Sequence, residues 1–463
     1  MKYLLSFALL LFSIMSIAQE SSITESNLLE IRSSYNKNDP STKALTNALS
    51  NNDITKIALS RENLSTVDHH FKYKVEVKGI SNQMKSGRCW MFTSMNTLRP
   101  MVIDKYKLSN FEFSHNYLYF WDIFEKANLY LEAQIKYADK PMDDKYVKWL
   151  FKSPVGDGGV WNSFTNLADK YGLVPKEVFP ETNSSNNTGW MIRIINRKLR
   201  EDGLELREIS STEAKGKELE SKKIEMLKDI YRILAMNLGE PPTEFKYRFV
   251  DKNDSIGEYK TYTPKSFMTE VLGDINFGDY VMLMNDPTRE YNKVYEIEYD
   301  RNVIEGRNWI YLNLPSDKLK ELAVKSIKNN VSMYASCDVG KQLNNNIGIA
   351  DVNNFDFESL YGVKFGMNKA ERINTFESGS SHGMALIAVD VDENEKPVKW
   401  QFENSWGTKS GHNGYLTFTD EWFNEYLFRV VVKREFIDAE IVKLLEQKPI
   451  VLPPWDPMFQ ADE

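Results

Sequence analysis

The chain has 463 residues, of which 42% are hydrophobic and 13% aromatic, and a formal net charge of −8 at pH 7. This length allows more than one domain with a large core, and the apolar content excludes general disorder. The acidic balance provides no basic footprint for nucleic acid, so we expect no nucleic-acid partner.

Residues 1–18 have the pattern of a secretory signal peptide. Lys2 precedes an apolar run at residues 3–15, and Ser16-Ile17-Ala18 places small residues before a cleavage site. The run is shorter than the roughly 20 residues that span a bilayer, so a membrane anchor is the weaker alternative. No later segment is apolar enough to span. The pattern predicts export to the periplasm or to the outside of the cell, with no membrane association.

Helices dominate the first half of the chain and strands the second half. The predicted elements, in chain order, are helices over 89–106 (kinked at Pro100), 114–136 and 161–172, a charged helical stretch over 190–238 broken at Gly203, short strands and turns over 245–315, a helix over 316–329, mainly strands over 331–432, and an extended proline-rich tail from Leu452.

This order predicts an α+β fold in which a long insertion separates a helical half from a β half. The predicted divisions are a signal peptide (1–18), an N-terminal extension (19–75), the helical half (76–189), the insertion (190–330), the β half (331–445) and a C-terminal tail (446–463).

The segment NQMKSGRCW, residues 82–90, has the features of a nucleophile site. Cys89 begins a predicted helix, where the partial positive charge of the N-terminus favours the reactive thiolate. Gly87 permits a tight turn before it. Gln83 can direct its side-chain amide to the same point as the Cys89 backbone N–H, and together the two donors would form an oxyanion hole. The alternative is a buried structural cysteine.

Two further motifs supply a base and a residue that orients it. His382 opens an apolar strand in SHGMALIAV, and Asn404 follows in ENSWG. A hairpin-like return would place them on adjacent strands, where the Asn404 side-chain oxygen can fix the imidazole tautomer. Trp406 can shield that hydrogen bond, and we also count it among the substrate-binding residues. A histidine at a strand start is more often structural, but the order Cys, His, Asn predicts a catalytic triad.

The segment GDGGVW, residues 156–161, is a candidate for substrate binding. It lacks the GK[ST] of a phosphate loop, so we reject nucleotide binding. Gly158 and Gly159 let an extended peptide backbone approach and pair. The alternative is a plain turn.

The other cysteine and histidines are weaker candidates. Cys337 lies in an apolar stretch that reads as a buried strand, so we expect a core thiol rather than a disulfide. Without an HExxH or CxxC motif, we expect no metal site and no cofactor. The remaining histidines are His69, His70, His115 and His412.

Taken together, these motifs resemble the bleomycin hydrolase / aminopeptidase C family of papain-like cysteine peptidases. Further matching segments are KYGLVPK, NDPT, CDVGK, MNKAER and the LPPWDPM tail, and the resemblance covers roughly residues 30–460. It implies a papain-like fold whose β half is barrel-like. It also implies that Gln83, Cys89, His382 and Asn404 take the family's catalytic roles and Gly158-Gly159 its substrate-backbone role.

The resemblance further implies aminopeptidase action on peptides, a homohexamer whose active sites face an inner channel, and a C-terminal tail that enters the active-site cleft. Two features depart from the family. Its members are usually cytosolic, whereas this chain carries an export signal. The chain also continues to Asp462 and Glu463, whereas the family ends in small apolar residues.

Other functions remain open at this point. An exported papain-type endopeptidase would usually carry a helical propeptide and several disulfides, which the sequence lacks. The complete Gln-Cys-His-Asn set argues against a catalytically silent binding or channel assembly. A papain-fold transglutaminase would normally have Asp at the position of Asn404.

Overall fold

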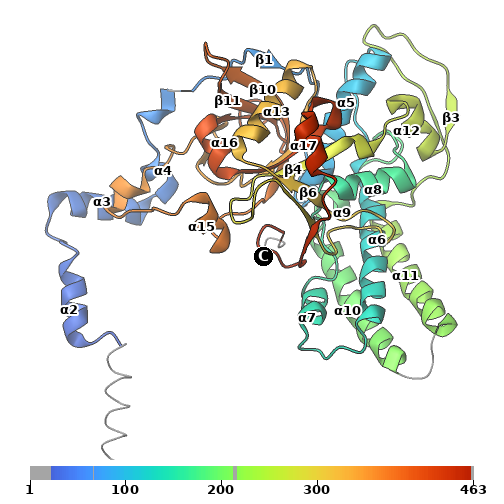
Figure 1. The fold of residues 1–463 in the computed structure, drawn as a ribbon, viewed down its shortest axis with the longest axis horizontal. Helices are drawn as coiled ribbons and strands as arrows, with labels where there is room; N and C mark the ends of the chain where they lie inside the picture. The colour runs from blue at the N-terminus through green and yellow to red at the C-terminus, as the bar shows by residue number, and fades with distance from the viewer. Residues whose placement is uncertain (1–21, 66, 212–215, 460–463) are drawn as a thin grey trace, which may run out of the picture. The chain divides into compact units, whose positions relative to one another are not determined.

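The computed structural model describes residues 22–459 except residue 66 and residues 212–215. The predicted signal peptide therefore lies outside the described residues. The chain divides into two compact units (Figure 1). Unit 1 contains the residues up to Arg61 together with Phe355–Phe365, and unit 2 contains Glu62–Asn354 and Gly366–Glu463. No helix of the described part combines the length and apolar character that a membrane span requires.

Unit 1 is built from short helices. Leu59 and Phe355 form an isolated β-bridge, which joins its two segments. None of the side chains of the first two helices is buried, and Leu29 and Ile31 are 63% and 55% exposed. The helices are α2 (Glu25–Ser33), α3 (Pro40–Asn51), α4 (Ile54–Ala58) and α14 (Phe357–Tyr361).

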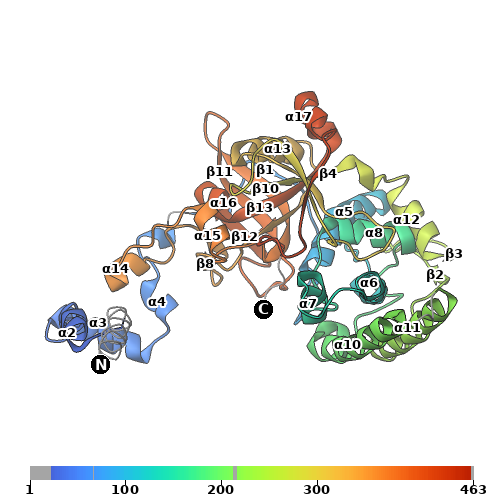
Figure 2. The same ribbon diagram turned by 60° about the horizontal axis from the view of Figure 1, so that its bottom comes forward.

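The helices of unit 2 lie mainly in its first half, as the sequence predicts. Figures 1 and 2 show α6, α10 and α11 side by side. The longer helices are α5 (Cys89–Tyr106), α6 (His115–Lys136), α7 (Lys145–Lys152), α8 (Trp161–Tyr171), α10 (Gly189–Ser211), α11 (Lys217–Leu238), α12 (Pro264–Leu272) and α13 (Ser316–Lys328). The shorter ones are α9 (Asn183–Asn186), α15 (Lys369–Asn374), α16 (Asp420–Tyr426), α17 (Ala439–Leu444) and the 3₁₀ turns η1 (Asn63–Ser65), η2 (Phe277–Asp279) and η3 (Arg434–Phe436).

The predicted helices over 89–106, 114–136, 161–172 and 316–329 are confirmed as α5, α6, α8 and α13. The break predicted at Gly203 is wrong, because α10 continues through this residue to Ser211. A Cβ at position 203 would lie 2.6 Å from the Tyr130 hydroxyl oxygen. Gly203 therefore allows α10 to pack closely on α6.

In the described residues, twelve strands of unit 2 form one mixed sheet with the order β14-β5-β6-β4-β13-β7-β10-β11-β12-β9-β8, and β1 pairs with β10. Its strands are β1 (Tyr73–Lys74), β4 (Tyr280–Met284), β5 (Lys293–Ile297), β6 (Ile310–Asn313), β7 (Met333–Cys337), β8 (Leu343–Asn344), β9 (Ile349–Ala350), β10 (His382–Val391), β11 (Pro397–Glu403), β12 (Tyr415–Thr419), β13 (Leu427–Lys433) and β14 (Ile450–Leu452). A separate hairpin pairs β2 (Phe245–Tyr247) with β3 (Lys260–Tyr262).

The division predicted at residue 330 does not separate the sheet. Strand β4, which precedes this position, pairs along its length with β13 in the predicted β half. Its side chains alternate between half-buried and buried before ending in two buried positions, so the strand belongs to the core. Three strands predicted as part of the insertion therefore extend the same sheet that carries His382.

Helix α5 is tied to strand β11 by a buried ion pair. Arg99 Nη2 lies 2.6 Å from Glu403 Oε1, and the two side chains are 1% and 0% exposed. Arg99 also donates hydrogen bonds to the Gly79 carbonyl and to Asn96 Oδ1. The pair links the helix that begins at Cys89 to the strand that ends immediately before Asn404.

The last described residues of the chain pack against other parts of unit 2. Strand β14 pairs in parallel with β5, and the Trp455 ring packs edge-on to the Tyr146 ring with 4.9 Å between centroids. The predicted extended tail is thus anchored at Trp455. The predicted entry of the tail into the active site concerns residues 460–463, which lie outside the described residues.

Replacing Arg99 by methionine should destabilise unit 2 strongly. The substitution would leave the Glu403 carboxylate buried without its partner, which costs about 3–5 kcal/mol. Arg232→Met is a matched control, because its ion pair with Asp229 is exposed and such pairs contribute about 0–1 kcal/mol. We expect urea denaturation to separate the two variants. Equal losses would contradict a structural role for the buried pair.

Candidate active site

Cys89 is the first residue of α5, and Arg88 is the residue at its N-cap position. The thiol is half-buried. Its Sγ accepts a hydrogen bond from the Gly383 backbone N–H at 3.5 Å. The sulfur thus lies between the N-terminus of an 18-residue helix and the first residues of β10. Both the helix end and this N–H favour the thiolate.

His382 and Asn404 contact each other as the sequence predicts. His382 begins β10, Asn404 follows β11, and these strands pair antiparallel. His382 Nε2 lies 2.8 Å from Asn404 Oδ1. An amide oxygen only accepts hydrogen bonds, so the neutral imidazole carries its hydrogen on Nε2 and leaves Nδ1 as the base. Asn404 Oδ1 also accepts from the Ser405 N–H at 2.7 Å, which fixes the amide.

Trp406 and Gln83 lie beside this pair. The Trp406 ring is 4.8 Å from the His382 ring between centroids. Gln83 is 6% exposed, and its Oε1 accepts from Ser405 Oγ at 2.6 Å. Its Nε2 donates to the Ser86 carbonyl at 2.6 Å. An amide nitrogen carries two hydrogens, so one remains for the oxyanion role that the sequence predicts.

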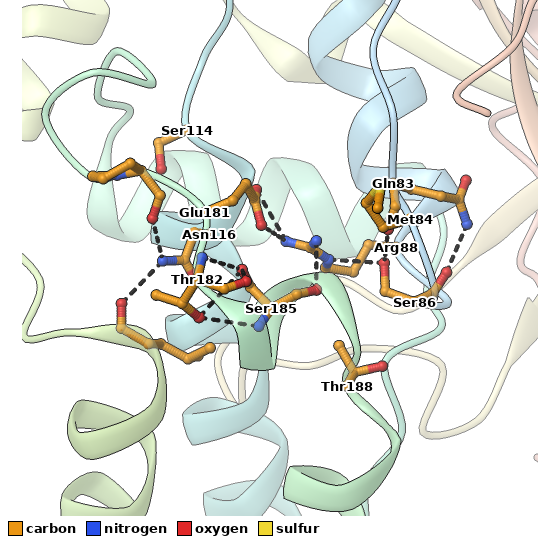
Figure 3. A network of polar contacts seen from close by, with 12 residues as sticks. Gln83, Met84, Ser86, Arg88, Ser114, Asn116, Glu181, Thr182, Ser185 and Thr188 are labelled. Atoms are coloured by element: carbon orange, nitrogen blue, oxygen red, sulfur yellow. Dashed lines mark hydrogen bonds and ion pairs between the residues drawn. The ribbon is translucent and has the colours of Figure 1, made fainter. Parts of the chain in front are cut away.

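The sequence reasoning missed the buried network that holds residues 86–88 (Figure 3). Arg88 is fully buried, and its guanidinium forms an ion pair with Glu181 at 2.9 Å. It also donates to the Ser185 carbonyl at 2.7 Å and to Ser86 Oγ at 3.0 Å. The available signal was the arginine next to Cys89, but its distant partner Glu181 could not be identified from sequence.

A second missed residue, Asp157, connects the glycine segment to the nucleophile segment. Its Oδ2 accepts from the Gly87 N–H at 2.7 Å and from Thr188 Oγ1 at 2.5 Å. Its carbonyl accepts from Trp90 Nε1 at 2.9 Å. Through these contacts, the Gly87 backbone and the Trp90 side chain, on either side of Cys89, are fixed relative to Asp157.

Gly158 and Gly159 lie in this loop but differ in their surroundings. The Gly158 carbonyl accepts from Lys126 Nζ at 2.6 Å, and a Cβ at this position would have no atom within 4 Å. A Cβ at position 159 would lie 2.7 Å from the Trp90 ring. The absence of a side chain at Gly159 is therefore a packing requirement as well as an opening for a substrate backbone.

Comparison with known proteins shows to which family the chain belongs. The Peptidase C1-like family model matches residues 22–459. The chain belongs to the peptidase C1-like family. It is 39% identical to mouse bleomycin hydrolase over 430 residues, which is 91% of this chain and 94% of the relative. It is 38% identical to aminopeptidase C of Lactobacillus delbrueckii subsp. lactis, over 89% and 92% of the two chains.

The fold of this C1-like peptidase also matches a solved structure. The crystal structure of PepW from Lactobacillus rhamnosis HN001 superposes with a TM-score of 0.91 at 37% identity, covering 95% of this chain and 99% of that chain. These comparisons confirm the predicted papain-like α+β fold, the cysteine-peptidase assignment and the resemblance to the bleomycin hydrolase / aminopeptidase C group.

Burial determines the protonation state of His382 and of the core thiol Cys337. It lowers the pKa of His382 to about 4, although the hydrogen bond to Asn404 opposes this shift.

Cys337 pairs with His382 in the β7–β10 register, and burial raises the pKa of its thiol well above the usual range. Cys89 and Cys337 are not joined by a disulfide. Cys337 is therefore an unreactive core thiol, whereas Cys89 lies at the helix N-terminus.

The other histidines within the described residues are placed differently. His115 stacks on Phe92 with 3.5 Å between centroids, and burial lowers its pKa well below the usual value. His69 stacks on His412 at 3.9 Å. In the part of the chain that the structure describes, no group of three or more His, Cys, Asp or Glu side chains is arranged to hold a metal ion.

The two glycines provide a matched pair of substitutions. Gly159→Ala would force the Trp90 ring or the loop to move, at a cost of about 1–3 kcal/mol, and should reduce kcat/KM sharply. Gly158→Ala has open space and should retain most of the activity. Peptide hydrolysis by the two purified variants tests this difference. Equal activity would show that the Trp90 contact does not constrain the site.

The low pKa of His382 predicts a pH dependence of stability in Cys89→Ala, where no thiolate can stabilise the imidazolium. The unfolded state binds the proton near pH 6.5 and the folded state only near pH 4. The His382 contribution is therefore fully present above pH 6.5 and falls toward pH 4, by about 3 kcal/mol. Unfolding of Cys89→Ala should show this loss, and Cys89→Ala/His382→Gln should show much less. Parallel pH profiles would refute the prediction.

Proposed function

We propose that this chain is a cysteine aminopeptidase, which hydrolyses peptide bonds near the free N-terminus of peptides. Cys89 is the nucleophile, His382 the base, and Asn404 the residue that orients the base. The proposal is carried mainly by one arrangement, in which Asn404 holds His382 through Nε2 while the next residue, Gly383, contacts the Cys89 sulfur. Thiol and base thereby meet where α5 reaches β10.

The reaction follows from this arrangement. His382 Nδ1 takes the proton of the Cys89 thiol as the sulfur attacks the scissile carbonyl carbon. The Cys89 backbone N–H and the remaining Gln83 amide hydrogen stabilise the negative oxygen. The imidazolium then protonates the amine as the C–N bond breaks, which leaves an acyl-enzyme thioester. A water molecule, deprotonated by His382, hydrolyses the thioester and regenerates the thiol.

Substrate binding in this proposal uses the loop next to Trp90. Gly158 and Gly159 would pair with an extended substrate backbone, and Trp406 would close the site beside His382. Aminopeptidase action is supported by similarity to aminopeptidase C and bleomycin hydrolase over about nine-tenths of the chain. We also propose, from the family resemblance, that the C-terminal tail enters the active-site cleft, where Asp462 and Glu463 would attract the positive charge of the substrate amine.

We also propose export and assembly. The pattern of residues 1–18 supports export to the periplasm or beyond the cell, and an N-terminus at Gln19 in the secreted protein would test it. A homohexamer with enclosed active sites follows from the family resemblance. The exposed apolar side chains of α2 provide surface for contact between copies. Sedimentation would distinguish a hexamer from a monomer.

Fluorogenic substrates with free and with blocked N-termini test the proposed activity. We expect faster hydrolysis of the free substrate and no turnover by Cys89→Ala, because the nucleophile has no substitute. His382→Ala should retain almost no activity, whereas Asn404→Ala should retain a measurable part, since Asn404 acts only by orienting the base. Turnover by Cys89→Ala above a mock preparation, or greater damage by Asn404→Ala than by His382→Ala, would reject these assignments.

A further inference from the structure

Lys126 of α6 holds the glycine segment of the active site. Its Nζ donates to the carbonyl oxygens of Gly156 and Gly158, at 2.9 and 2.6 Å, and to Asp122 Oδ2 at 2.7 Å. An ammonium group carries three hydrogens, so these contacts use all of its donors. The side chain is only 14% exposed. Lys126 therefore fixes two carbonyl groups of the segment and has no donor left for another partner.

A buried carboxylate sets the position of this ammonium group. Asp122 lies one helical turn before Lys126, and its side chain is fully buried. Its other oxygen, Oδ1, accepts from Asn302 Nδ2 at 2.8 Å, and Asn302 also donates to the Ser163 carbonyl at 3.0 Å. A buried charge needs such compensating contacts. Because Asn302 fixes the carboxylate, the carboxylate in turn fixes Nζ of the lysine.

The contact with the Gly158 carbonyl determines where the next N–H points. The peptide bond between Gly158 and Gly159 is trans, so its C=O and N–H point in opposite directions. With the carbonyl turned to Lys126, the Gly159 N–H is directed away from the lysine. Among the described residues this N–H has no hydrogen-bond partner, and Gly159 is half-buried. The N–H is thus a donor available to a substrate carbonyl.

Lys126 is the main restraint on this peptide. Three of the four residues at 156–159 are glycines, which have the widest choice of backbone conformations. Among the described residues, Lys126 Nζ is the one donor to the Gly158 carbonyl. The contacts of Asp157 hold the preceding part of the segment and do not involve this carbonyl. Loss of the lysine would therefore let the peptide rotate and the Gly159 N–H turn away from a substrate.

We propose that Lys126 is a positioning residue, which turns the Gly158–Gly159 peptide so that the Gly159 N–H pairs with the backbone of a peptide substrate. The carbonyl that it pairs with is not the scissile one, because the Cys89 N–H and the Gln83 amide take the scissile oxygen. A substrate with several peptide groups therefore gains from Lys126, whereas an aminoacyl amide, which has the scissile carbonyl alone, does not. The inference rests on the peptidase activity proposed above.

The test compares two substrates with a free amine: a tetrapeptide, and an aminoacyl p-nitroanilide with the same first residue, chosen as one that the wild-type enzyme accepts. For Lys126→Met we expect kcat/KM of the tetrapeptide to fall about tenfold, mainly through KM, which is the scale of one lost hydrogen bond to the substrate. For the p-nitroanilide it should change by less than about twofold. Lys126→Arg, which keeps donors for the two carbonyls, should restore part of the tetrapeptide activity.

Lys198 of α10 provides a matched control, whose ion pairs are with residues of its own helix. Like Lys126, it pairs with a fully buried aspartate four residues away, Asp202, at 2.8 Å. Lys198→Met therefore leaves a comparable buried carboxylate without its partner, and it should leave the ratio of the two activities unchanged. If Lys126→Met does not fold, Lys126→Met/Asp122→Asn, which also removes the uncompensated carboxylate, should show the same selective loss.

The outcomes separate this inference from the proposed function. Wild-type enzyme without activity on any free-amine substrate would reject the proposed function and, with it, this inference. Active wild-type enzyme with equal losses on both substrates in Lys126→Met would show that the lysine is merely structural. Undiminished hydrolysis of the tetrapeptide by this variant would show that the Gly158–Gly159 peptide needs no lysine. A selective loss of the same size in Lys198→Met would also reject the role of Lys126.

Discussion

The close approach of α5 to β10 is the contact on which the site depends. Gly383 lies at this contact, where a Cβ would lie 3.3 Å from the Tyr334 hydroxyl oxygen, 3.4 Å from Thr93 Oγ1 and 3.5 Å from the Trp90 Cα. Here the N-terminus of the helix reaches the strand, and the Gly383 N–H reaches the Cys89 sulfur. The nucleophile and base come from segments almost 300 residues apart, and this packing brings them together.

Buried charges then fix the orientation of the two elements. Arg99 joins the middle of α5 to Glu403, next to Asn404, while Arg88 joins the start of α5 to Glu181. Neither pair is an efficient source of stability, because desolvation offsets most of the attraction. Their geometry is specific, however, since each guanidinium also donates to a backbone carbonyl. The Arg99 pair restricts the angle of the helix relative to the sheet more than an apolar contact would, while the Arg88 pair fixes the start of the helix within the helical half.

Sequence patterns predicted the helices and strands whose formation depends on residues close together in the chain. The apolar spacing gave α5 and α8 nearly to the residue, and the strand beginning at His382 with its return to Asn404 followed from the alternation of apolar runs and turns. The parts that failed depend on distant partners. Gly203 reads as a helix break, but packing of α10 on α6 outweighs its low helix propensity. The contacts of Glu181 and Lys126 could not be read from the sequence, because they form only once residues far apart in the chain are brought together.

The same packing sets the charge state of the catalytic pair. With the pKa of His382 at about 4 and that of an ordinary thiol near 8.5, moving the proton from Cys89 to His382 would cost about 6 kcal/mol without mutual attraction. Attraction between the imidazolium and the thiolate offsets part of this cost. A helix N-terminus contributes up to about 2 kcal/mol more.

Both contributions therefore lower the free energy of the charged form of the pair. The attraction weakens as sulfur and imidazole separate, and the contribution of the helix falls off beyond the first turn of α5. A displacement of α5 from β10 would therefore disfavour the reactive thiolate while leaving the fold intact. The precision supplied by Gly383, Arg88 and Arg99 is thus a requirement of the chemistry, beyond any contribution to stability.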